Sequence, residues 1–126
     1  MQHLDIRETA KSWFGLYGRF LNSKLCPLTD KPRVWSTKQK SDYLESLYYG
    51  NPTKSWFVQE TRVGHWILKY GHEQFYTLLD FQNDIFQSSL ANWTVSVTDQ
   101  LIKIQVIRYS VSQEDVQETI RRYLSE

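Results

Sequence analysis

Two apolar runs dominate the middle of the chain, at residues 65–70 and 75–81, and the four residues Gly71-His72-Glu73-Gln74 separate them. Within each run the side chains alternate between two faces with the period of a β-strand, and both faces carry large apolar groups. This pattern predicts a central β-hairpin over residues 64–81. Because both faces are apolar, we expect the hairpin to be covered on both sides or to lie in the middle of a sheet.

The segment before this hairpin begins with a helical pattern. Apolar residues recur at helical spacing from Ile6 to Leu25, and Asp5 and Glu8 stand in capping-box spacing at the start. We therefore predict a first helix of about twenty residues, packed on the sheet. The prolines within residues 22–34 indicate a loop after it.

A second helix is predicted at residues 36–49 from signals at both of its ends. Ser36 can cap its first turn while the side chain of Gln39 reaches back to the backbone. Gly50 terminates the helix, and Pro52 bars its extension.

Strand patterns lie on both sides of the central hairpin. Aromatic and β-branched residues predict a strand at 55–63, and Gly64 allows a turn from it into the hairpin, giving three successive antiparallel strands. After the hairpin, Asn83 or Asp84 can cap a short helix that ends near Asn92.

The last third of the chain predicts two further strands and a helix. Residues 93–98 and 102–106 alternate between an apolar and a polar face around a turn at Asp99-Gln100, so we expect this pair at the solvated end of the sheet. Ser112 and Asp115 stand in capping-box spacing at the start of a C-terminal helix. The buried face of this helix is predicted to contain Val116, Ile120, Tyr123 and Leu124.

The elements follow one another in the order α-α-β-β-β-α-β-β-α. This order predicts a single α+β domain over residues 1–126, with helices packed on an antiparallel sheet of about five strands. If helix 36–49 is treated as an insertion, the remaining order α-βββ-α-ββ-α is similar to that of type III secretion chaperones and related small α+β dimers. The resemblance is one of predicted topology, covers most of the chain and implies a fold of that type.

Composition agrees with an ordinary globular chain, in which 40% of the residues are hydrophobic and 23% are charged. No apolar run approaches the ~18 residues of a membrane span, and the N-terminus lacks the apolar segment of a signal peptide. We therefore expect no membrane association and a cytoplasmic, intracellular location. Cys26 is the only cysteine, which rules out an internal disulfide and fits a reducing compartment.

Aromatic content and charge distribution narrow the functional classes. Five Trp, eight Tyr and six Phe exceed what a small core needs, and exposed aromatic rings are good interface anchors. Residues 11–69 contain ten basic and four acidic residues, whereas residues 70–126 contain four basic and eight acidic ones. This asymmetry indicates either two halves that attract each other within one fold or an anionic partner for the basic half.

Motifs for catalysis or cofactor binding are missing from the sequence. Phosphate-binding glycine loops and the GxSxG and SxxK patterns do not occur, and His3, His65 and His72 lack the spacing of metal ligands. We therefore predict neither a cofactor nor a metal site, and we assign no catalytic residue. A small enzyme stays open as an alternative, with His65, His72 and Glu73 at the central hairpin as its titratable groups.

These observations favour a non-catalytic adaptor or chaperone-like protein that acts through protein–protein contacts, with a homodimer as a further expectation. Its predicted contact residues are aromatic groups supported by cations: Trp35, Tyr48, Tyr49, Trp56, Arg33, Lys38, Lys40 and Arg62. The alternative is a nucleic-acid-binding accessory protein that uses the basic, aromatic-rich segment 31–69, since cations bind phosphates and rings stack on bases.

Overall fold

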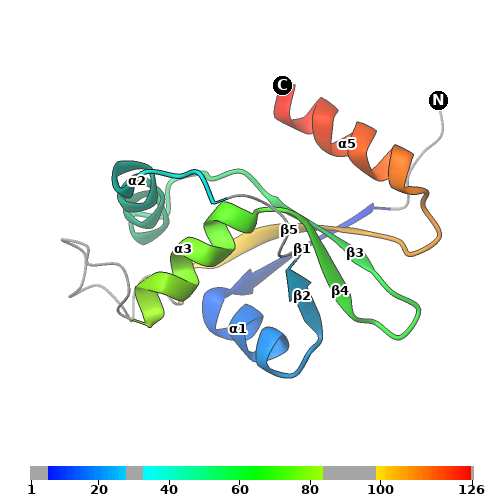
Figure 1. Cartoon of the computed structure of the whole chain (residues 1–126), viewed down its shortest axis with the longest axis horizontal. Coiled ribbons are helices and arrows are strands. Elements are labelled where there is room, and N and C mark those ends of the chain that lie inside the picture. Colours follow the sequence, from blue (N-terminus) through cyan, green and yellow to red (C-terminus); the bar gives the residue numbers. More distant parts are fainter. Residues whose placement is uncertain (1–5, 28–32, 84–98, 126) are drawn as a thin grey trace.

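The computed structural model describes residues 6–27, 33–83 and 99–125, which form a five-stranded mixed sheet with helices on both faces (Figure 1). Within the described residues the sheet has the strand order β1-β5-β3-β4-β2. In chain order the elements are β1 (Ile6–Ser12), α1 (Trp13–Leu21), β2 (Leu25–Pro27), α2 (Thr37–Tyr48), β3 (Trp56–Glu60), β4 (Trp66–Tyr70), α3 (His72–Gln82), β5 (Leu101–Ile107) and α5 (Gln113–Ser125).

The sheet combines antiparallel and parallel pairs. β1 pairs with β5 and β3 pairs with β4 in antiparallel fashion, whereas β3 and β5 are parallel, as are β2 and β4. The prediction of about five strands with helices packed on them is confirmed. The predictions of a wholly antiparallel sheet and of the element order are wrong, because the described order is β-α-β-α-β-β-α-β-α. The topological similarity to type III secretion chaperones disappears with that order.

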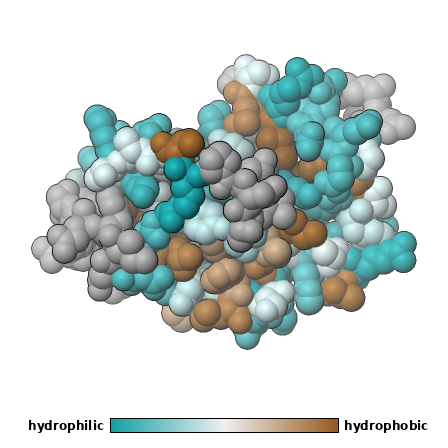
Figure 2. Space-filling model, viewed as in Figure 1, coloured by the Kyte–Doolittle hydropathy of each residue, from teal (hydrophilic) through white to brown (hydrophobic). Residues whose placement is uncertain are grey.

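Two hydrophobic cores lie on opposite faces of the sheet. The larger one packs α1, α2 and α3 against one face, and the smaller one packs α5 against the other (Figure 1). Successive residues of β3 show this division, because Trp56 and Val58 belong to the larger core and Phe57 to the smaller one. Figure 2 shows apolar surface around α1 and along the side of α5 that faces the sheet.

The N-terminal helix predicted from Ile6 to Leu25 is wrong in its first half. Residues 6–12 form the edge strand β1, which pairs with β5 from Ile6↔Ile107 to Ser12↔Leu101. Helical spacing is real only from Trp13 onward, where the Oγ of Ser12 accepts a hydrogen bond from Gly15 N at 3.2 Å and caps α1. Pairing with a distant strand therefore overrides the local helical pattern of residues 6–12.

The central hairpin is confirmed in its first arm and wrong in its second. β4 forms the first arm and has a neighbour on each side, β3 and β2, as expected for a strand in the middle of a sheet. The second arm is helix α3. Its apolar residues Phe75, Leu78 and Phe81 are buried at spacings of three, which is the spacing of one helix face and not of an alternating strand. Gly71, which follows the last residue of β4, has a φ of 117° and is the N-cap residue of α3.

The remaining predictions divide between confirmed elements and residues outside the described part. The helix predicted at 36–49 is α2, and its capping box forms, with Ser36 N donating to Gln39 Oε1 at 2.8 Å. The C-terminal helix is α5, although Leu124 on its predicted buried face is 39% exposed. The strand at 102–106 is β5, which lies between β1 and β3 and not at the solvated end.

The short helix predicted after residue 83 and the strand at 93–98 lie outside the described residues. Among the helices that the structure does describe, none is long and apolar enough to cross a bilayer.

Candidate functional site

Four of the eight predicted contact residues gather where the chain enters α2. Trp35 is half-buried against the larger core, and its ring centroid lies 5.8 Å from that of Tyr43. Around it, the guanidinium of Arg33 and the Nζ of Lys40, the latter at 3.8 Å, both face the carboxylate of Asp80. The fourth residue is Lys38, whose Nζ lies 2.8 Å from Asp42 Oδ2.

The other four predicted contact residues lie elsewhere. Tyr48 and Tyr49 end α2, where their rings make a T-shaped contact at 5.0 Å, and only Tyr49 is largely exposed. Arg62 lies in the turn between β3 and β4, with its guanidinium carbon 5.4 Å from the ring centroid of Tyr109. Trp56 is a correction, because its side chain is 0% exposed and fills the larger core, which leaves it no surface for a partner.

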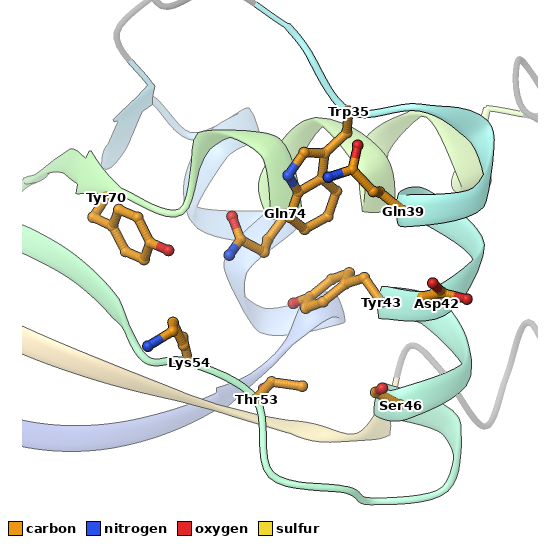
Figure 3. Close-up of a pocket in the computed structure, with 9 residues that line it drawn as sticks. All are labelled: Trp35, Gln39, Asp42, Tyr43, Ser46, Thr53, Lys54, Tyr70 and Gln74. Atoms are coloured by element: carbon orange, nitrogen blue, oxygen red, sulfur yellow. The ribbon is translucent and has the colours of Figure 1, made fainter. Parts of the chain in front are cut away.

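A cleft of about 330 Å³ opens beside Trp35, between α2 and the sheet, and we call it the Trp35 cleft (Figure 3). In Figure 3, Trp35, Gln39 and Asp42 lie on one side of it, and Tyr70 and Lys54 lie across from them. The cleft is lined by Trp35, Gln39, Asp42, Tyr43, Ser46, Thr53, Lys54, Tyr70 and Gln74.

Two carboxylates of α3 hold the Trp35 side of the cleft in place. The two oxygens of Glu73 accept hydrogen bonds from the backbone N–H groups of Val34, at 3.0 Å, and Trp35, at 2.7 Å. Two turns further along α3 lies Asp80, which is 7% exposed and binds the side chain of Arg33. Charge-assisted hydrogen bonds of this kind are stronger than neutral ones, so the backbone that carries Trp35 is fixed before any partner arrives.

Glu73→Gln is expected to lower the free energy of unfolding by about 1–3 kcal/mol, because an amide nitrogen would then face one of the two backbone N–H groups. Urea denaturation followed by circular dichroism measures the change. Glu45→Gln, which alters an exposed carboxylate on α2, serves as the control and should change stability by less than about 0.5 kcal/mol. Equal effects of the two substitutions would show that Glu73 does not fix the Trp35 backbone.

The floor of the cleft contains polar groups that lack hydrogen-bond partners. Gln74 is 7% exposed and lines the cleft, yet its amide takes part in none of the hydrogen bonds found among the described residues. The hydroxyl of Tyr43 is also buried without a partner within that part of the chain. In Figure 3 both groups point into the space between Trp35 and Tyr70. The Gln74 amide is thus free to exchange hydrogen bonds with a ligand in the cleft, whereas the Tyr43 hydroxyl is shielded below its surface.

Burial raises the pKa of the Tyr43 hydroxyl well above its ordinary value. The indole N–H of Trp56 beside it acts in the opposite direction and more weakly, and the two atoms do not form a hydrogen bond of ordinary geometry. Tyr43 is therefore a neutral hydrogen-bond donor throughout the physiological pH range.

This shift predicts a loss of stability in alkali. The pKa of Tyr43 is higher in the folded chain than in the unfolded one. The stability that the neutral Tyr43 hydroxyl gives the folded chain is therefore complete below the pKa of the unfolded chain, about 10, and declines as the pH rises above it. Urea denaturation between about pH 8.5 and 11 should show a steeper decline for the unmodified chain than for Tyr43→Phe. Parallel declines would contradict the buried, neutral state of Tyr43.

Two neighbouring hollows share Tyr70 with the Trp35 cleft. One, of about 240 Å³, lies over the start of α3 and also shares Trp35 and Gln74 with the cleft, so these two hollows adjoin. The other, of about 470 Å³, is the groove between β4 and α5, which covers the opposite face of the sheet, and it has only Tyr70 in common with the cleft.

The two histidines of the alternative catalytic site lie apart. His65 and His72 stand just before and just after β4, at opposite ends of a five-residue strand, and a strand rises about 3.3 Å per residue. His65 is exposed, whereas His72 is buried in the first turn of α3. Among the described residues no group of three or more His, Cys, Asp or Glu side chains could hold a metal ion.

Of the nine lining residues, only Trp35 was among the contact residues predicted from the sequence. Gln74 was placed in the turn of the expected hairpin, where a polar residue is unremarkable. Had residues 72–82 been assigned to a helix, Gln74 would have stood next to Phe75 on the buried side, and a polar residue there is a recognisable signal.

Comparison of the chain with protein-family models, with curated proteins and with solved structures gives no match.

Proposed function

We propose that this chain is a non-catalytic binding protein, of the adaptor or chaperone-like kind, that takes a segment of a partner protein into the Trp35 cleft. The observation that carries the proposal is the Gln74 amide, which lines the cleft and takes part in none of the hydrogen bonds among the described residues. Its N–H groups and its oxygen are therefore available to a partner.

The extent of the cleft favours an extended segment over a small compact molecule. The hollow over the start of α3 shares Trp35, Tyr70 and Gln74 with the cleft, so a bound chain can run from one into the other. A glutamine amide is both donor and acceptor and therefore matches the peptide group. Trp35, whose backbone is already held by Glu73, supplies an apolar wall for a side chain of the partner.

Nucleic-acid binding by segment 31–69 has less support. Arg33, Lys38 and Lys40 each lie against the carboxylate of Asp80 or Asp42, which reduces the positive charge they offer to a phosphate backbone. A mobility-shift assay at low salt distinguishes the two functions. We expect no shift with single-stranded or duplex oligonucleotides at tens of micromolar protein, and a retarded band would favour the nucleic-acid alternative.

The homodimer also stays a prediction. Phe14 and Leu21, which are 75% and 62% exposed, stand seven residues apart on α1 and so share one side of that helix. Light scattering at high protein concentration measures the mass directly: a strictly monomeric species would exclude self-association.

Site-specific photo-crosslinking tests the proposed function. A benzophenone amino acid at Gln39, on the exposed rim of the cleft, should capture a discrete partner protein in cells, and Trp35→Ala should abolish that product. The same probe at Lys11, an exposed residue of β1, is the control and should not capture it. Products that survive Trp35→Ala, or that form equally from Lys11, would contradict binding in the cleft.

A further inference from the structure

The hydrogen-bond donors and the cation of the Trp35 cleft indicate which chemical groups the partner carries. This inference rests on the proposed function. The described lining residues include one ammonium group, Lys54, whose Nζ lies 5.5 Å from the ring centroid of Tyr123. None of the ion pairs among the described residues involves Lys54. The cleft therefore contains a cation that a carboxylate of the partner can neutralise.

The one acidic lining residue does not neutralise Lys54. Asp42 lies across the cleft in Figure 3, and its Oδ2 is bound by the Nζ of Lys38 at 2.8 Å. In the neighbouring hollow, Glu73 is occupied by the backbone N–H groups of Val34 and Trp35. The charged groups left for a ligand on the Tyr70 side of the cleft are thus positive.

The uncharged polar groups of the cleft also favour an acceptor. The Gln74 amide offers two N–H donors beside its one oxygen. The hydroxyl of Tyr70 lines the same side as Lys54 and makes no hydrogen bond within the described chain. A carboxylate, which only accepts, can be satisfied by several of these donors at once.

We propose that the partner segment is acidic and places an aspartate or glutamate side chain against Lys54 in the Trp35 cleft, while its backbone pairs with Gln74. The assignment is to an internal side chain of a segment that continues into the adjoining hollow over the start of α3, and a C-terminal carboxylate is an outcome that the test distinguishes.

A peptide-display selection on the full-length chain tests this assignment. Random linear peptides are selected on the immobilised protein, and fluorescence anisotropy then gives the affinity of each recovered peptide. We expect an acidic consensus position and an affinity that falls about tenfold or more on Lys54→Glu in the protein, or on Glu→Gln at that position of the peptide. Lys11→Glu, the same charge change on the exposed edge strand β1, should alter the affinity less than about twofold.

Different failures separate this inference from the proposed function. Peptides that lose affinity on Trp35→Ala and Gln74→Ala but show no acidic preference would overturn the inference and leave the proposed function in place. Peptides whose binding is abolished by amidating their C-terminus, but not by Glu→Gln, would show that the ligand is a chain-end carboxylate and contradict the assignment. A selection that recovers no peptide dependent on Trp35 or Gln74 would count against both.

Discussion

Replacing Trp56 with alanine is expected to lower the free energy of unfolding by about 3–5 kcal/mol. The side chain is 0% exposed, and its ring makes an edge contact with Phe75 at 6.3 Å in the larger core. Removing it leaves a cavity that rigid neighbours fill only in part. Urea denaturation followed by circular dichroism measures the loss, which is a large share of the stability of a domain of this size.

Tyr49→Ala is the matched control for this substitution. Tyr49 was predicted as a contact residue on the same grounds as Trp56, but it is 60% exposed and its ring contacts that of Tyr48, so its removal should change stability by only about 1 kcal/mol. Similar losses for the two variants would mean that Trp56 is not the core residue described here.

The second large effect is expected at Gly71, where alanine should cost about 3 kcal/mol or more. Its φ of 117° is unfavourable for any side chain, and an added Cβ would lie 2.8 Å from the Cγ of Trp56. Both the backbone strain and the collision fall on the point where β4 passes into α3. The collision cannot be relieved by a flexible side chain, because Trp56 is packed on all sides.

Gly50→Ala separates the two causes. Gly50 also has a positive φ, 69°, but an added Cβ would meet nothing within 4 Å, so only the backbone strain of about 1 kcal/mol applies. Denaturation curves of the two variants should therefore differ clearly. Equal losses would indicate that Gly71 is needed only for its backbone angle.

The elements that could be predicted from the sequence are those whose signals are local. Helix α2 carries its own stop and start signals, because Ser36 and Gln39 cap each other and Gly50 follows its end. Strand β1 has no such local signals, because the strand with which it pairs, β5, lies at the other end of the chain. For the same reason, the parallel pairing of β3 with β5 cannot be inferred from residue patterns, so the sheet was predicted to be wholly antiparallel.

The candidate site shows the same division. Arg33 and Trp35 were predicted from their chemistry, and both lie at or beside the cleft. Trp56 has the same chemistry but fills the core, because aromatic content alone does not separate buried rings from exposed ones. Gln74 was missed because the turn expected at residues 71–74 is the first turn of α3, which places its amide in the cleft.

The central claim is that the Gln74 amide binds a partner segment in the Trp35 cleft, and Gln74→Met tests it most directly. Methionine has a similar length but no amide, and the Gln74 amide makes no hydrogen bond among the described residues, so the free energy of unfolding should change by less than about 1 kcal/mol. In the same variant, affinity for a peptide that binds in the Trp35 cleft should fall about tenfold or more. A variant that is less stable and binds that peptide as tightly as the unmodified chain would contradict the claim.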